Sequence, residues 1–284
     1  MTRSCCALLT LAGCLPTLPT LDDPCGAFPQ AGLYRLPLDD AEGKQRVNLV
    51  YVPRGTGPRD LVFMLHGAGQ NPDIMQSVTG WNEQAERQGF AVVYPPGTGG
   101  MDKVWNAGDN PYTDADDVAY LDRVAETATE RLCGARILAV GFSNGASMAH
   151  TWGCQSPWPD AIVPTEGAYL ADRCPEIPKP IRAYHGTADT TVPIEGAVRE
   201  GVAIPGLDET MALKAEQNAC EDLPPTVTTA GAETCETWQG CAASTVACTL
   251  SGWGHRYPGG DNRVGLPFDA TADSWAWFDA VVPR

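Results

Sequence analysis

One segment of the sequence carries a serine in the setting that nucleophilic serines occupy. Gly141-Phe142-Ser143-Asn144-Gly145 has the pattern G-x-S-x-G, follows the apolar run 137–140 and precedes a run of small residues. In hydrolases with this pattern the serine stands on a sharp strand-to-helix turn. Its neighbours must be small because the turn is strained and the helix packs closely on the strand. Ser143 is therefore the candidate nucleophile, and a glycine-rich connection without catalytic importance is the alternative.

A serine hydroxyl needs a base and an acid, and the chain order expected after such a turn is serine, acid, histidine. Of the four histidines, His255 alone lies beyond the acid candidate, in a segment rich in glycine and proline. Asp189 follows the apolar run 181–184, so we expect it at the carboxyl edge of a sheet. There it would accept the ring N–H of His255 and fix the tautomer of the imidazole. An ordinary surface-loop histidine is the alternative for His255.

Two backbone N–H groups are candidates for an oxyanion hole. Ala68 lies in His66-Gly67-Ala68-Gly69, directly after an early apolar run, and Asn144 is the residue after the nucleophile. Their N–H groups would hold the negative charge of a tetrahedral intermediate. Read alone, the glycine-rich segment around Ala68 indicates only a tight turn, and it gains weight from the other motifs.

The elements that must position these residues can be read from hydrophobic patterning. Two alternating segments, 33–36 and 47–52, predict an opening antiparallel hairpin. Short continuous apolar runs are typical of strands buried on both faces of a parallel sheet. These runs are 61–65, 91–94, 137–140, 161–163 and 181–184. Helical spacing over 118–132 and an amphipathic segment at 275–282 complete the pattern. We therefore expect an α/β fold, with a mostly parallel central sheet and helices on both faces.

Composition limits the classes of protein that this chain can be. Its 284 residues are 43% hydrophobic and 19% charged, which excludes a disordered protein. A net charge of −16 has the wrong sign for phosphate backbones, so nucleic-acid binding is not expected. No apolar run reaches the roughly 18 residues that a membrane-spanning helix needs. We expect one catalytic domain, residues 33–284, acting as a monomer.

The amino terminus predicts export. Residues 1–14 run from a basic residue through an apolar stretch to small residues, the order of a secretion signal. Leu11-Ala12-Gly13-Cys14 is also similar to the lipobox of bacterial lipoproteins, so Cys14 is a candidate for acylation and the protein for a lipid anchor. An ordinary cleaved signal, or a wrongly assigned start codon, is the alternative. Residues 15–32 alternate proline with small and apolar residues at their start, and we expect a linker there.

Eight cysteines lie beyond this leader, and in an exported chain they are expected to form disulfides. Zinc is the competing interpretation, and the absence of any Cys-x-x-Cys pair argues against it. A hairpin formed by 234–239 and 245–250 would place Cys235 opposite Cys248. The remaining pairs are then expected to be Cys220–Cys241, Cys154–Cys174 and, by elimination, Cys25–Cys133. No metal or other cofactor is expected.

Taken together, the motifs resemble the α/β-hydrolase serine esterase family of feruloyl esterases, acetylxylan esterases and polyhydroxybutyrate depolymerases, over residues 33–284. They are Leu65-His66-Gly67-Ala68-Gly69-Gln70, Tyr94-Pro95-Pro96-Gly97, Trp105-Asn106-Ala107-Gly108, Asp116-Asp117-Val118, the G-x-S-x-G segment, His185-Gly186-Thr187-Ala188-Asp189 and Gly254-His255-Arg256-Tyr257-Pro258-Gly259. The segment Cys235-Glu236-Thr237-Trp238-Gln239-Gly240-Cys241 is similar to the feruloyl esterase branch. The resemblance implies the triad Ser143, Asp189 and His255. Ala68 stands where many relatives have cysteine, and Tyr257 where tryptophan is usual.

The resemblance and the triad together predict an exported serine carboxylic-ester hydrolase that acts through an acyl-enzyme. The expected substrate is a feruloyl or acetyl ester on plant cell-wall polysaccharide, with polyhydroxybutyrate as the alternative. A hydrolase-fold domain that only binds a polymer or a partner is the rival of another class. Trp105, Trp253 and Tyr257 are candidates to line the substrate cleft, and packing in the core is the alternative for each.

Overall fold

The computed structural model describes residues 15–26, 28, 30–98, 103–108, 113–170, 177–199, 202–263, 265 and 268–284. The predicted leader, with Cys14, lies outside these residues. Within them, every helix is too short or too polar to cross a membrane.

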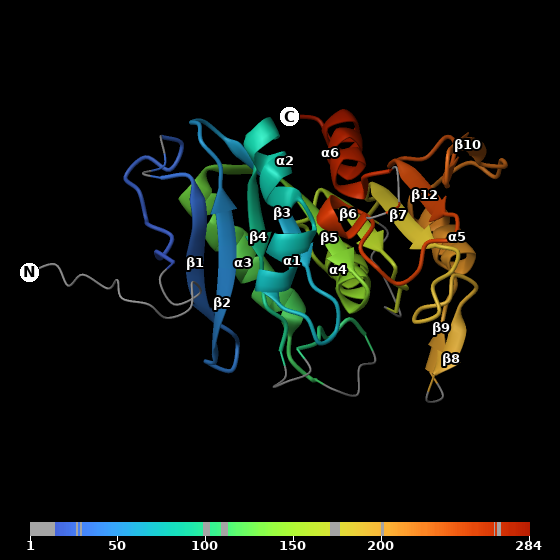
Figure 1. Cartoon of the computed structure of the whole chain (residues 1–284), viewed down its shortest axis with the longest axis horizontal. Helices are drawn as coiled ribbons and strands as arrows, with labels where there is room; N and C mark the ends of the chain where they lie inside the picture. Colours follow the sequence, from blue (N-terminus) through green and yellow to red (C-terminus); the bar gives the residue numbers. More distant parts are fainter. Residues whose placement is uncertain are drawn as a thin grey trace, which may run out of the picture.

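A central sheet of ten strands runs through the molecule (Figure 1). The strands of this sheet are β1 (Gly32–Asp39), β2 (Gln45–Val52), β3 (Arg59–Leu65), β4 (Ala91–Tyr94), β5 (Gly134–Phe142), β6 (Ala161–Thr165), β7 (Ile181–Gly186), β10 (Thr226–Ala230), β11 (Glu233–Thr237) and β12 (Thr245–Leu250). Their spatial order is β1-β2-β4-β3-β5-β6-β7-β12-β11-β10. The strands from β4 to β12 in this order are parallel, and antiparallel pairs form both ends of the sheet. The carboxyl ends of the parallel strands therefore share one edge.

Helices cover both faces of the sheet, as the apolar runs predict. The helices are α1 (Pro72–Val78), α2 (Trp81–Gln88), α3 (Asp117–Leu132), α4 (Asn144–Gln155), α5 (Leu207–Gln217) and α6 (Ala270–Val281). In Figure 1, α1, α2 and α6 lie in front of the sheet, and α3 and α4 lie behind it. Leu61 and Phe63 of β3 join the core under α3 and α4, whereas Val62 and Met64 join the core under α2 and α6. The strand is thus buried on both faces.

Two elements differ from the sequence prediction. The closing helix α6 begins at Ala270, five residues before the predicted start, because the Asp269 side chain accepts the N–H of Thr271 and caps the helix there. A two-stranded sheet formed by β8 (Ala197–Arg199) and β9 (Val202–Ile204) was not expected at all.

The segment after the leader packs against the fold and is not a free spacer. Leu18 is 1% exposed and lies in the hydrophobic core, and its N–H donates to the carbonyl of Arg35 in β1. Cys25 is bonded to Cys133, at the end of α3. The expectation of a linker over residues 15–32 is therefore wrong for this part, because an apolar side chain and a disulfide fasten it to the domain.

Disulfides join three of the expected cysteine pairs. Besides the Cys25–Cys133 bond, the structure contains Cys220–Cys241 and Cys235–Cys248. Cys235 lies opposite Cys248 in the antiparallel pairing of β11 with β12, so the predicted hairpin register is confirmed. The fourth expected pair involves Cys174, which lies outside the described residues.

Candidate active site

Ser143 stands on a strained turn between β5 and α4. Its backbone has φ 55° and ψ −122°, a left-handed conformation that a side chain rarely adopts. The turn is held by the N–H of Ser143, which donates to the carbonyl of Thr165 at the end of β6. A Cβ atom at Gly141 would overlap the carbonyl of Gly145, and one at Gly145 would overlap the carbonyl of Leu65. The glycines of the motif are thus required by the close approach of strand and helix.

A continuous chain of hydrogen bonds joins Ser143, His255 and Asp189. The Nε2 atom of His255 lies 2.9 Å from Oγ of Ser143, and its Nδ1 atom lies 2.7 Å from Oδ2 of Asp189. The other carboxylate oxygen of Asp189 accepts the backbone N–H groups of Thr191 and Val192, at 2.7 and 2.9 Å. The His255 side chain is 18% exposed, whereas that of Asp189 is fully buried. The serine end of the chain is thus the end that solvent and substrate can reach.

The charge on Asp189 is stabilised by these donors. Burial by itself raises the pKa of a carboxyl group, but the His185 ring 3.6 Å away and the hydrogen bonds from His255 and the Val192 N–H outweigh it and hold the pKa of Asp189 well below its ordinary value. Asp189 is therefore an anion at neutral pH. Such an anion fixes the proton of His255 on Nδ1 and leaves Nε2 free to accept a proton from Ser143.

The loop that carries His255 is anchored to the loop that carries Asp189. The N–H of Ala188 donates to the carbonyl of Trp253, and the N–H of Thr187 donates to the carbonyl of Leu250 at the end of β12. Gly186 approaches Trp253 so closely that a Cβ atom there would overlap its carbonyl. The two loops follow β7 and β12, which are parallel neighbours, so the sheet itself brings acid and base together.

The two candidate oxyanion donors flank the serine. Asn144 is the first residue of α4, where the helix dipole favours negative charge. Ala68 lies in an exposed turn after β3, and its neighbour Gly67 lies against the serine: a Cβ atom at Gly67 would be 3.2 Å from that of Ser143. The side-chain amide of Asn144 accepts the N–H of Trp105 at 2.7 Å and donates to its carbonyl at 3.1 Å. This pairing fixes the Trp105 loop beside α4.

The ring of His66 is hydrogen-bonded to the turn that carries Ala68, a role that the sequence pattern did not indicate. Its Nε2 atom accepts the N–H of Gly97 at 2.8 Å, so Nδ1 carries the proton and donates to the carbonyl of Gly67 at 2.8 Å. Burial lowers the pKa of His66 to about 4, and the ring is therefore neutral at physiological pH. A neutral ring can both accept and donate, as the two bonds require.

The structure corrects the expectation that three aromatic residues line the substrate cleft. Trp105, Trp253 and Tyr257 are 0%, 4% and 1% exposed, so their rings offer almost no surface to a ligand. Each polar atom is bonded inside the protein: Trp105 donates to the carbonyl of His66, Trp253 donates to that of Arg256, and the Tyr257 hydroxyl accepts from Trp81. These residues are packing groups beneath the site.

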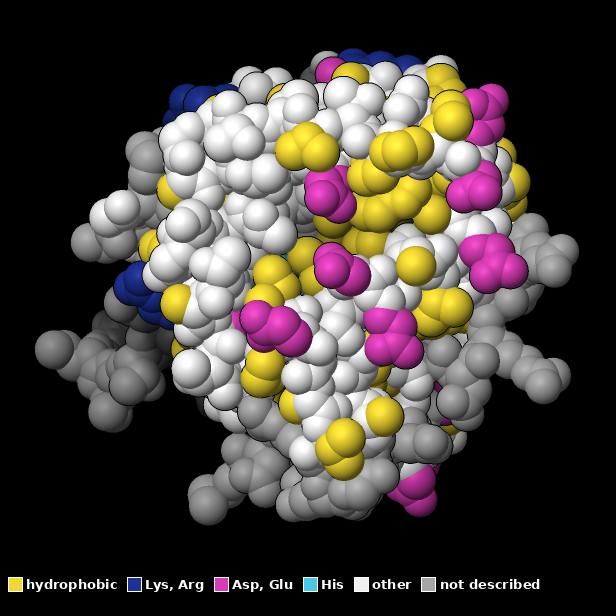
Figure 2. Space-filling model, turned by 90° about the vertical axis from the view of Figure 1, so that its right-hand side faces the viewer, with side chains coloured by type: hydrophobic (Ala, Val, Ile, Leu, Met, Phe, Trp, Pro, Cys, Tyr) yellow, Lys and Arg dark blue, Asp and Glu magenta, His cyan; other side chains and the backbone are white. Residues whose placement is uncertain are grey.

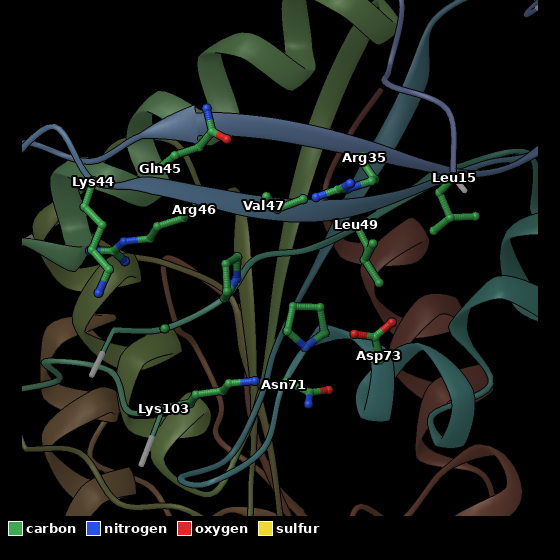
Figure 3. A pocket seen from close by; sticks show the side chains of 13 residues that line it. Leu15, Arg35, Lys44, Gln45, Arg46, Val47, Leu49, Asn71, Asp73 and Lys103 are labelled. Carbon is green, nitrogen blue, oxygen red and sulfur yellow. The ribbon is translucent and has the colours of Figure 1, made fainter. Parts of the chain in front are cut away.

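A cavity of about 380 Å³ with a mixed apolar and charged lining lies beside the Ala68 turn (Figure 3). Gly97, which donates to His66, lines it, and so does Lys103, whose carbonyl accepts the N–H of Gly69. Its charged lining residues are four cations and one acid: Arg35, Lys44, Arg46, Lys103 and Asp73. This excess of cations contrasts with the net charge of −16 and with the acidic face that carries β8, β9 and α5 in Figure 2. Of these cations, Arg46 is buried and already paired with Asp40 and Asp117.

Glu166 is a further buried group beside the triad that sequence patterns did not single out. One carboxylate oxygen each from Glu166 and Asp189 and one ring nitrogen of His185 lie within 4.8 Å of one another. Its position in the sequence could have indicated this role, because Glu166 directly follows the apolar strand β6 and so lies at the same edge of the sheet as Asp189.

The sequence is similar to those of known esterases. The family model described as Esterase PHB depolymerase matches residues 48–167. Feruloyl esterase B of Piromyces equi is 28% identical over 218 residues, which are 69% of this chain and 40% of that protein. The bifunctional acetylxylan esterase/xylanase XynS20E of Neocallimastix patriciarum is 29% identical over 154 residues, which are 52% of this chain and 22% of that protein. The chain thus spans less than half the length of either relative.

Among solved structures, the acetyl xylan esterase from Aspergillus awamori superposes with a TM-score of 0.67 at 14% sequence identity. The match covers 87% of this chain and 98% of that one. At this identity the similarity concerns the fold, and it confirms the α/β-hydrolase architecture expected from the sequence.

Proposed function

We propose that this chain is a member of the esterase family of feruloyl esterases, acetylxylan esterases and polyhydroxybutyrate depolymerases, and that it is a serine carboxylic-ester hydrolase whose triad is Ser143, His255 and Asp189. The observation that carries the proposal is the unbroken hydrogen-bond chain from the Ser143 hydroxyl through His255 to Asp189 on a strained turn.

The geometry suits a two-step acyl transfer. His255 takes the Ser143 proton on Nε2 while Oγ attacks the ester carbonyl carbon, and the imidazolium that forms is stabilised by Asp189. His255 then protonates the departing alkoxide, which leaves an acyl-enzyme on Ser143. A water molecule, deprotonated by His255, attacks this acyl group, and Oγ leaves with the proton that His255 returns. The imidazole thus acts as base and acid once in each half of the reaction.

The tetrahedral intermediates carry a negative oxygen that needs fixed donors. The backbone N–H groups of Ala68 and Asn144 flank Ser143 and are proposed to supply them, with the start of α4 adding a favourable dipole. Ala68 acts through its backbone, so the absence of a cysteine side chain at this position does not remove the donor.

The proposed substrate is a feruloyl or acetyl ester on plant cell-wall polysaccharide. The names of the relatives support this choice. Polyhydroxybutyrate is the second candidate, because the matching family model is described as a depolymerase of that polymer.

Export is proposed on two grounds. The disulfides at Cys25–Cys133, Cys220–Cys241 and Cys235–Cys248 are typical of oxidising compartments. The signal-like leader adds the second ground, with acylation of Cys14 and a cell-envelope location as one form of export and simple cleavage as the other.

Fluorophosphonate labelling and an ester panel test the proposal together. We expect the wild-type protein to be labelled on Ser143 and Ser143→Ala to remain folded and unlabelled, with ester hydrolysis lower by roughly 10⁴–10⁶. The exposed Ser77→Ala, on α1, is the matched control. The panel compares methyl ferulate, an acetylated xylan and a 3-hydroxybutyrate oligomer. Wild-type protein that is neither labelled nor active on the panel would indicate the rival function, a hydrolase fold that only binds its ligand. Hydrolysis by Ser143→Ala within tenfold of wild type would refute Ser143 as the nucleophile.

A further inference from the structure

The carboxyl side chain of Glu166 is buried beside Asp189, the acid of the triad. Glu166 is 0% exposed and directly follows β6. Its φ of 51° is left-handed, a conformation that costs a residue with a side chain of order 1 kcal/mol or more. The preceding carbonyl, of Thr165, holds the N–H of Ser143, and the N–H of Glu166 itself donates to Tyr184 in β7. The strained backbone thus turns this side chain under the triad.

The contacts of the Glu166 carboxyl are few and specific. Both of its oxygens lie within hydrogen-bond distance of the N–H of Gly186, at 3.1 and 2.9 Å. Oε2 lies 3.8 Å from Nε2 of His185, and Asp189 is the other carboxyl within reach. His185 points its Nε2–H mainly at the carbonyl of Val192, 2.8 Å away, so it does not neutralise Glu166.

Two carboxyl groups in one buried cluster do not both ionise without a cation between them. Asp189 accepts hydrogen bonds from Thr191, Val192 and His255, whereas Glu166 receives one backbone N–H. Burial raises the pKa of Glu166 well above its ordinary value, and the neighbouring negative charge of Asp189 raises it further. The proton of the pair therefore resides on Glu166.

We propose that Glu166 is a positioning residue that, as a neutral carboxylic acid, donates its O–H to the carboxylate of Asp189 while its carbonyl oxygen accepts the N–H of Gly186. The bond would hold the Asp189 carboxylate in the plane that His255 requires and would share its negative charge. This inference rests on the proposed function, because it assigns a role to Glu166 only if Asp189 and His255 serve Ser143.

If Glu166 is neutral, a glutamine at this position can make the same two hydrogen bonds. A neutral carboxylic acid and a primary amide both present one acceptor and one donor in the same geometry, whereas an ionised carboxylate can only accept. In Glu166→Gln the amide oxygen can accept from Gly186 and the NH₂ group can donate to Asp189. Glu166→Met has a similar volume and neither group, so it separates the hydrogen bonds from the packing.

The test measures kcat, KM and the pH dependence of kcat/KM for an aryl ester. For Glu166→Gln we expect kcat and KM within about threefold of wild type and an unchanged acid limb, where His255 takes up a proton. For Glu166→Met we expect a loss in kcat of about ten- to a hundredfold with little change in KM, because a slightly misplaced Asp189 misplaces the base. Its acid limb should move to higher pH, because an unshared charge on Asp189 stabilises the imidazolium more strongly.

Three outcomes would overturn the proposal. A loss of more than tenfold in Glu166→Gln, or an acid limb that moves to lower pH in it, would mean that an ionised Glu166 had been removed. Equal activity and equal pH profiles for the Gln and Met variants would mean that the side chain only fills space. The exposed Glu86→Gln, on α2, is the charge-matched control.

Infrared difference spectroscopy tests the protonation state of Glu166 directly, and it does not require the Met variant to fold. At pH 7 the wild-type protein should show the carbonyl stretch of a protonated carboxylic acid that Glu166→Gln lacks, and the absence of this band would contradict a neutral Glu166. Failure of the proposed function would appear differently, as a wild-type protein that neither hydrolyses esters nor labels on Ser143.

Discussion

Replacing Asp189 by asparagine reverses one hydrogen bond of the triad and leaves the others in place. Oδ1 of Asp189 accepts two backbone N–H groups at 2.7 and 2.9 Å, so the amide oxygen must take this position because an NH₂ group there would face two donors. The NH₂ group then occupies the Oδ2 position and faces Nδ1 of His255, which at present lies 2.7 Å away.

The reversal changes the tautomer of the base. Nδ1 of His255 must accept from the amide, so the ring proton moves to Nε2, and Nε2 then presents a donor to Ser143 Oγ instead of a lone pair. We expect kcat to fall by about 10⁴, as in serine hydrolases whose acid is changed in this way, which corresponds to roughly 5.5 kcal/mol of transition-state stabilisation. KM should change little, because no group that touches the substrate is altered.

The assay is steady-state hydrolysis of an aryl ester, with urea unfolding to establish that the variant is folded. Asp208→Asn, an exposed substitution at the start of α5, removes the same charge far from the loops of the triad and should leave kcat unchanged. A folded Asp189→Asn protein with kcat within tenfold of wild type would refute the view that Asp189 sets the tautomer of His255.

Three further predictions concern the framework of the site. Gly145→Ala should lower stability by about 2 kcal/mol or more and abolish fluorophosphonate labelling, because the added methyl group overlaps a carbonyl of β3; an intact labelling rate would contradict it. Arg46→Met should cost about 3–5 kcal/mol in urea unfolding, because it leaves the buried Asp117 carboxylate, now 2.6 Å from the guanidinium, unpaired. Replacing both cysteines of the Cys235–Cys248 bond by alanine should cost about 2–4 kcal/mol, and peptide mapping that links Cys235 elsewhere would show the pairing to be wrong.

Hydrophobic patterning predicted the parallel sheet because each of its strands is buried on both faces and leaves a continuous apolar run. The same reasoning explains why patterning did not predict β8, β9 and β10. All five residues of β10 are exposed at the end of the sheet, so this strand carries no apolar signal. The strands of the β8–β9 hairpin have only three residues each, which is too short for a recognisable pattern.

The candidate site was predictable to the extent that its residues come from local motifs. The turn at Ser143 and the chain order of Asp189 and His255 are properties of short segments. The direction in which a side chain points is not a property of a short segment. The sequence therefore suggested that the indole of Trp105 lines a cleft, whereas it lies in the core. The environment of Glu166 is formed by Gly186, about twenty residues away, and by Asp189. No short sequence pattern therefore predicts a buried acid at this position.

Two of the four described non-glycine residues with a positive φ angle lie beside the triad, and this placement has a physical reason. Ser143 and Glu166 both have left-handed φ angles, 55° and 51°, and β5 and β6, which they follow, are neighbouring strands. Gly167 lies so close to the carbonyl of Ser143 that a Cβ atom would be 2.6 Å from it. Two such conformations cost a few kcal/mol together, and they persist only because the buried sheet beneath leaves no alternative path. The same rigidity keeps a serine, a histidine and an aspartate at hydrogen-bond distance before any substrate arrives, which is the condition for preorganised catalysis.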